Sequence, residues 1–79
     1  MEERRKTPRR KIFKAGMIIT HDRFSTVNCV VRNVSEAGAA IDTETAVLLP
    51  ARFELLFDGR SCNCEMSWRA QRRLGVRFA

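Results

Sequence analysis

The feature that most constrains the fold is the pair Asp58-Gly59, which separates two runs of alternating apolar and polar residues. Asp-Gly readily adopts the left-handed backbone conformations that a two-residue β-hairpin turn requires. Residues 52–57 and 61–69 place an apolar side chain at every second position, as in a strand with one buried face. The sequence therefore predicts a hairpin here. The side chains expected to face the core are Phe53, Leu55, Phe57, Cys62, Cys64, Met66 and Trp68, and those expected outside are Asn63, Glu65, Ser67 and Arg69.

Four further segments have strand-like character. They are residues 12–20, with a bend expected near Gly16, and residues 25–33, 39–41 and 74–78. Polar turns separate these segments, and closing such a sheet removes edges that would otherwise promote aggregation. The sequence therefore predicts an all-β fold, a small six-stranded antiparallel barrel with little or no helix.

Two segments leave alternatives open. In residues 25–33, Val27, Cys29 and Val31 share one face, whereas Val30 and the following Val34 fall on the other. Either both faces of this strand are partly covered, or the strand shifts its register near its end. Residues 43–50 form either a turn of helix that ends at Pro50 or a loop with buried leucines.

The aromatic and histidine side chains are interpreted as structural. His21 lies in the polar segment 20–23 with no acid or nucleophile pattern around it, so a solvated turn residue is favoured over a catalytic base. Four aromatic residues lie on strand faces marked as apolar, which favours core packing over a base-stacking platform. They are Phe53, Phe57, Trp68 and Phe78, whereas Phe13 and Phe24 have no clear assignment.

Length and composition indicate one globular domain. The chain has 79 residues, 44% hydrophobic and 30% charged, and its N-terminus is charged without the apolar segment of a secretory signal, so a cytoplasmic location is expected. Three cysteines cannot all pair, and Cys62 and Cys64 are too close for a comfortable disulfide. Cys29 and His21 are not spaced as partners in a zinc site, so no metal is expected and the thiols are interpreted as small core residues.

The positive charge is concentrated at one end. The net charge is +6, and residues 1–14 carry seven Lys or Arg against two Glu, which leaves +1 for the other 65 residues. Residues 1–11 contain few apolar side chains, and Pro8 opposes a helix. The sequence is therefore divided into a flexible basic arm, residues 1–11, and a barrel, residues 12–79. The arm is either a solvated leader or a segment that becomes ordered against a ligand.

No pattern in the sequence indicates catalysis. A G-x-S-x-G motif and a phosphate-binding glycine loop are both missing, and Ser35 has no base in its sequence context that could activate it. The expected activity is therefore binding rather than chemistry.

Two short motifs indicate what is bound. The arm contains R-x-x-x-R at Arg5 and Arg9, and the turn between two predicted strands reads N-x-S-x-x-G at Asn33, Ser35 and Gly38. Guanidinium groups match the acceptors of both phosphate and the O6/N7 edge of guanine. With the barrel pattern around them, these motifs resemble those of the PilZ family, bacterial receptors for the second messenger cyclic di-GMP. The similarity extends to the Asp58-Gly59 hairpin and to the closing segment 74–78.

The resemblance implies a role for each motif residue. Arg5 and Arg9 would grip guanine and phosphate, and the turn residues Asn33, Ser35 and Gly38 would contact the dinucleotide from the barrel. Arg4, just before the first motif arginine, favours an intercalated pair of ligands over a single molecule. Asn33 occupies a position where many relatives have Asp, which changes the charge that faces the ligand.

The arm would then fold over cyclic di-GMP and relay the signal to a partner protein that the sequence does not identify. No other cofactor and no membrane insertion are expected. Two other functions are consistent with the same residues. One is a basic barrel that binds nucleic acid, which would show broad and steeply salt-dependent binding. The other is a PilZ-type adaptor that binds no nucleotide.

Overall fold

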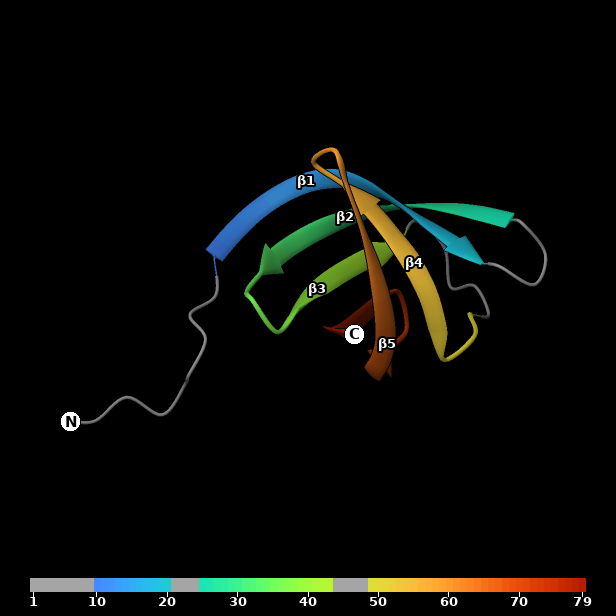
Figure 1. The fold of residues 1–79 in the computed structure, drawn as a ribbon. Coiled ribbons are helices and arrows are strands. Elements are labelled where there is room, and N and C mark those ends of the chain that lie inside the picture. Colours follow the sequence, from blue (N-terminus) through green and yellow to red (C-terminus); the bar gives the residue numbers. More distant parts are fainter. Residues whose placement is uncertain (1–9, 21–24, 44–48) are drawn as a thin grey trace.

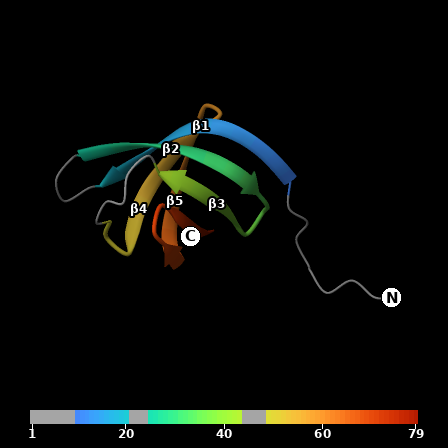
Figure 2. The same ribbon diagram turned by 180° about the vertical axis from the view of Figure 1, so that it is seen from behind.

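The computed structural model describes residues 10–20, 25–43 and 49–79. These ranges contain six strands and no helix: β1 (Arg10–Thr20), β2 (Ser25–Val34), β3 (Gly38–Thr43), β4 (Arg52–Phe57), β5 (Arg60–Ala70) and β6 (Arg73–Phe78). They close into a barrel in the order β1-β2-β3-β6-β5-β4, and every neighbouring pair is antiparallel (Figures 1 and 2). The predicted all-β barrel is confirmed.

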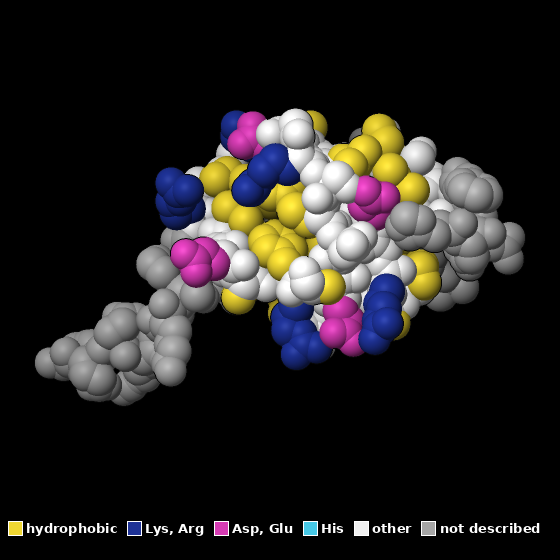
Figure 3. All heavy atoms as spheres, in the orientation of Figure 1, with side chains coloured by type: hydrophobic (Ala, Val, Ile, Leu, Met, Phe, Trp, Pro, Cys, Tyr) yellow, Lys and Arg dark blue, Asp and Glu magenta, His cyan; other side chains and the backbone are white. Residues whose placement is uncertain are grey.

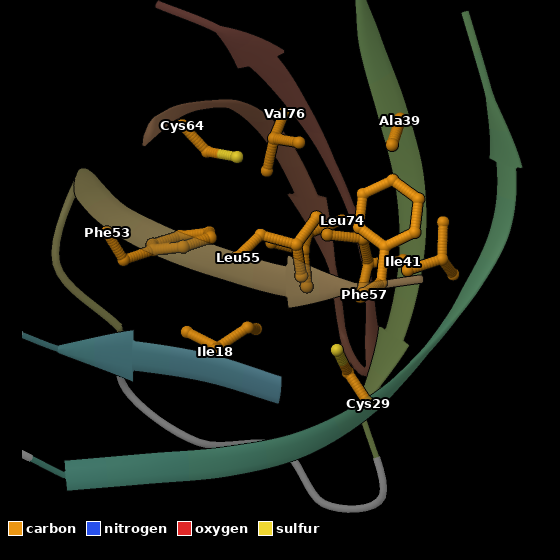
Figure 4. Close-up of a cluster of buried hydrophobic side chains, with 11 residues drawn as sticks. Ile18, Cys29, Ala39, Ile41, Phe53, Leu55, Phe57, Cys64, Leu74 and Val76 are labelled. Atoms are coloured by element: carbon orange, nitrogen blue, oxygen red, sulfur yellow. The ribbon is translucent and has the colours of Figure 1, made fainter. Parts of the chain in front are cut away.

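The core is a cluster of aliphatic, aromatic and thiol side chains inside this barrel (Figure 4). Phe53, Leu55 and Phe57 of β4 all point into it, as their alternation predicts. Burial raises the pKa of Cys29 to about 11 and that of Cys64 to about 12, so both thiols stay protonated at neutral pH. All three cysteines are free, and these two serve as small apolar residues of the core.

The β4–β5 hairpin has the predicted turn. Asp58 and Gly59 have φ angles of 54° and 73°, the left-handed values that a tight two-residue turn needs. The flanking residues Phe57 and Arg60 pair directly, so the hairpin fixes where β5 begins.

The open question about β2 is resolved in favour of a register shift. The pairing of β2 with β3 shifts between Val31 and Asn33, so Val34 packs against the core while Val30 stays exposed. β1 also has a register shift, which lies between Lys11 and Lys14, whereas the bend expected near Gly16 stays a prediction. The register shift of β1 centres on Phe13, which has a φ angle of 50° and an exposed ring under the guanidinium group of Arg32.

The prediction for Trp68 is wrong. The pairing of β5 with β6 shifts between Met66 and Trp68, so two residues of β5 oppose one of β6. Such an extra residue moves every later side chain to the opposite face. Cys64 is therefore buried and Met66 packs against the core, but the indole of Trp68 lies outside with 46% of its surface exposed.

Several expectations fall on residues that the structure does not describe. They concern His21, Phe24 and the segment 44–48, together with most of the basic arm. In the described ranges no helix could cross a membrane, and no group of three or more His, Cys, Asp or Glu could hold a metal ion.

Candidate functional site

The turn between β2 and β3 is shaped by the side chain of Ser35. Its hydroxyl oxygen accepts hydrogen bonds from the backbone N–H groups of Ala37 (3.2 Å) and Gly38 (3.3 Å). The backbone N–H of Ser35 donates to the carbonyl of Gly38 at 2.8 Å. A serine at this position therefore fixes the path of the turn by bonding the backbone two and three residues later.

Gly38 is required by the contact between β3 and β6. Its φ angle is not positive, so the left-handed conformation that a turn glycine often supplies is not used here. Gly38 pairs with Arg77, and a Cβ at Gly38 would lie 2.0 Å from the carbonyl oxygen of Val76. No side chain fits at that distance, so the glycine lets the two strands approach closely.

The third residue of the turn motif, Asn33, lies within β2. It is half-buried and sits opposite Lys11 of β1 and Ala40 of β3, immediately after the register shift. Asn33, Ser35 and Gly38 thus belong to one continuous structural unit, the end of β2 and its turn into β3.

The arginines Arg4, Arg5 and Arg9 lie outside the described residues. The first described residue, Arg10, pairs with Val34, the neighbour of Ser35. The chain therefore enters the barrel directly beside the turn, where the motif arginines of the arm are attached.

An exposed tryptophan lies next to this turn. Ser35 and Gly38 line a shallow hollow of about 130 Å³ together with Trp68, Gly75 and Arg77. We call it the Trp68 hollow. A Cβ at Gly75 would lie 2.6 Å from Cε2 and 2.9 Å from Cδ1 of the indole, so the ring rests directly on the backbone of β6.

Sequence reasoning missed Trp68 as a site residue. The signal that could have found it is Gly75, because a glycine inside a strand often marks the close approach of another group. Trp68 and Gly75 are paired across β5 and β6.

A cation lies at the edge of the Trp68 hollow. Arg77 of β6 has 66% of its side chain exposed and donates from Nη2 to Oε1 of Glu65 at 2.7 Å. The hydrogen bond and charge of Arg77 hold the pKa of Glu65 below its usual value, so this carboxylate is ionised at neutral pH. The pair orients one guanidinium group beside the exposed indole.

A second hollow also has Ser35 in its lining. It has a volume of about 350 Å³ and is lined by Arg10, Val34, Ser35, Glu36 and Arg60. We call it the Glu36 hollow. Figure 3 shows one face of the molecule, on which apolar side chains lie at the centre and basic and acidic side chains surround them.

Comparison with known proteins identifies a family. A family model of the PilZ domain matches residues 3–79, which include both motifs and all six strands. No curated protein matches the chain.

Proposed function

This chain belongs to the PilZ domain family, and on that premise we propose that it is a receptor for cyclic di-GMP that binds the dinucleotide at the Ser35–Gly38 turn. PilZ domains are a family of cyclic di-GMP-binding domains rather than enzymes. The proposal assigns that family activity to this chain and locates it on the surface beside the turn.

The observation that carries the proposal is the exposed indole of Trp68 in a hollow shared with the turn. An exposed aromatic ring packed against a strand offers a stacking surface to a nucleobase, and such stacking contributes about 1–3 kcal/mol per base. Arg77 lies in the same hollow, and its guanidinium group suits a phosphate or the O6/N7 edge of guanine. The hollow therefore offers groups for both parts of a guanine nucleotide.

The turn itself presents a polar surface to the ligand in this proposal. The hydroxyl of Ser35 reaches the carbonyl oxygen of Gly38 only at 3.5 Å. A contact of that length is weak, so the hydroxyl proton can turn towards a phosphate oxygen while the two N–H bonds to the same oxygen persist. Asn33 would contribute an amide from the end of β2.

The basic arm supplies the remaining cations in this proposal. Arg5 and Arg9 grip guanine and phosphate, and Arg4 favours an intercalated pair of dinucleotides. The arm joins the barrel beside the turn, so closing it over the ligand changes the surface at that end of the barrel. A partner protein that recognises the closed arm would receive the signal. The cytoplasmic location expected from the sequence remains a prediction.

Calorimetric titration with cyclic di-GMP at moderate salt tests this function. GMP and a short oligonucleotide serve as control ligands, and the single tryptophan of the chain provides an independent fluorescence signal from the hollow itself. We expect saturable heat and a change in Trp68 emission with cyclic di-GMP alone. A ratio near two ligands per chain would support the role given to Arg4.

Two variants, one in the arm and one control in the barrel, test whether the arm binds the ligand. Arg9→Ala should abolish binding. Arg69→Ala should leave binding unchanged, because this arginine lies near the end of β5 with its Nε bonded to the carbonyl of Gln71. Equal binding of the oligonucleotide would instead favour the basic nucleic-acid-binding barrel. No heat and no emission change on a folded sample would refute the receptor function and leave the adaptor function.

A further inference from the structure

The Glu36 hollow contains ionisable groups of both signs that do not neutralise one another. Among the described residues, no ion pair joins the carboxylate of Glu36 to Arg10 or Arg60. The other carboxylates in the described ranges all have partners: Asp42 with Arg32 and Arg73, Glu54 with Ser61, Asp58 with Lys14, and Glu65 with Arg77. Glu36 differs from them in that no ion pair among the described residues involves it, and it lines the hollow as an exposed residue.

One wall of the hollow is formed by an arginine that lies over an aromatic ring. Arg60 directly follows the Asp58-Gly59 turn, and its guanidinium carbon lies 5.2 Å from the centre of the Phe57 ring. The ring lies beside the guanidinium group, and an exposed guanidinium group is a suitable stacking partner for a planar ligand. Val34, partly buried against the core, adds an apolar surface.

The mixture of charges restricts the ligand. A ligand without hydrogen-bond donors would leave the Glu36 carboxylate unmatched, and a ligand without acceptors would leave the two guanidinium groups unmatched. A group that fits must present hydrogen-bond donors to the carboxylate and acceptors to a guanidinium group along adjoining edges. Guanine does so: its N1–H and N2–H₂ groups are neighbouring donors, and its O6 and N7 atoms are neighbouring acceptors.

From this complementarity we infer that the Glu36 hollow is a guanine-reading subsite of the cyclic di-GMP site. Glu36 accepts from N1–H and N2–H₂, Arg60 stacks on the base or donates to O6 and N7, and Arg10 contacts the adjoining phosphate. Ser35 lines both this hollow and the Trp68 hollow, so two bases of one bound assembly can lie on either side of the turn. The inference depends on the proposed function for the identity of the ligand.

Glu36 then determines the preference for guanine over adenine. Adenine places an acceptor, N1, where guanine has the N1–H donor, so a carboxylate at this position would face a lone pair. A good bidentate contact to a base contributes about 1–3 kcal/mol of discrimination, which corresponds to about 5- to 150-fold in affinity.

The experiment compares the affinities of cyclic di-GMP and cyclic di-AMP for the full chain and its variants. Glu36→Gln should weaken cyclic di-GMP binding at least about fivefold and leave the affinity for cyclic di-AMP unchanged or higher. The preference for cyclic di-GMP over cyclic di-AMP should therefore fall. Arg60→Ala should also weaken cyclic di-GMP binding. Glu54→Gln, which alters a carboxylate on the outer face of β4 bonded to Ser61, is the matched control and should leave both affinities unchanged.

The outcomes separate this inference from the proposed function. If the wild-type chain binds cyclic di-GMP but Glu36→Gln keeps its affinity and its preference for guanine, the subsite is wrong and the receptor function stands. If the wild-type chain does not bind cyclic di-GMP, the proposed function fails and the subsite fails with it. Glu36 and Arg60 are both exposed, so the variants should melt at the wild-type temperature.

Discussion

Replacing Gly38 with alanine should destabilise the barrel before it affects any ligand. The new Cβ would lie 2.0 Å from the Val76 carbonyl oxygen, whereas real Cβ contacts are not shorter than 3.0 Å, so β3 and β6 must separate by about 1 Å. The atoms in the way are backbone, including the Cα of Arg77 at 3.2 Å, and no rotamer change relieves them. Overpacking of this kind costs about 1–3 kcal/mol, and each ladder hydrogen bond that stretches adds about 1 kcal/mol.

The expected net loss for Gly38→Ala is about 2–3 kcal/mol after about 0.4–1 kcal/mol is recovered from the stiffer unfolded chain. A domain of this size has a free energy of unfolding of about 4–12 kcal/mol and loses about 4–8 °C of Tm per kcal/mol. Thermal melts should therefore show a fall of about 10–20 °C.

Gly59→Ala is the control for Gly38→Ala. Its Cβ meets nothing within 4 Å, so only the positive φ of 73° opposes the alanine. We expect a loss of about 1 kcal/mol from that strain. If Gly38→Ala melts like the wild type and loses only ligand binding, the argument from strand contact is refuted, and the glycine serves the ligand directly.

Two further substitutions test the surface around the turn. Gly75→Ala should displace the indole of Trp68 rather than the backbone, so we expect a shifted tryptophan emission and weaker cyclic di-GMP binding with little change in Tm; unchanged emission would contradict the stacked geometry. Partial burial alone would raise the pKa of Asp42, but the hydrogen bonds and charges of Arg73 and Arg32 outweigh it and lower the pKa. The stability contributed by this carboxylate is therefore present above its unfolded pKa of about 3.9 and is lost as the pH falls through its lower folded value. Asp42→Asn should cost about 1 kcal/mol in urea melts at neutral pH and nothing in strong acid, and a deficit that stays constant with pH would contradict the ion-pair role.

The parts of the fold that were predicted correctly are those set by local sequence. The Asp58-Gly59 hairpin follows from the conformational preference of two residues, and the inward face of β4 follows from strict alternation. The errors occur where one strand gains a residue relative to its neighbour. A bulge depends on how two strands pair, so the reversal of Trp68 could not be read from the alternation of β5 alone.

The candidate site also contains some residues that the sequence predicts and others that only the fold reveals. Ser35 and Gly38 are recognised by their motif because they lie within four residues of each other in the sequence. Trp68 and Arg60 come from β5, and they reach the turn only because the barrel closes. No spacing rule within the sequence connects them to Ser35, so their place beside it is known only from the three-dimensional arrangement.

The geometry of the turn also limits what the motif alone can show about binding. The hydroxyl of Ser35 holds two backbone N–H groups, and Gly38 allows β3 to approach β6, so both residues serve the fold whether or not a ligand is bound. A family member that had lost its ligand could therefore keep both residues for stability. Loss of binding in a Ser35 or Gly38 variant would therefore not show that the residue contacts the ligand. The surface that each residue supports would change shape in the variant. The side chain of Glu36 is exposed and lies outside the core, so a variant at this position distinguishes a receptor from an adaptor without disturbing the fold.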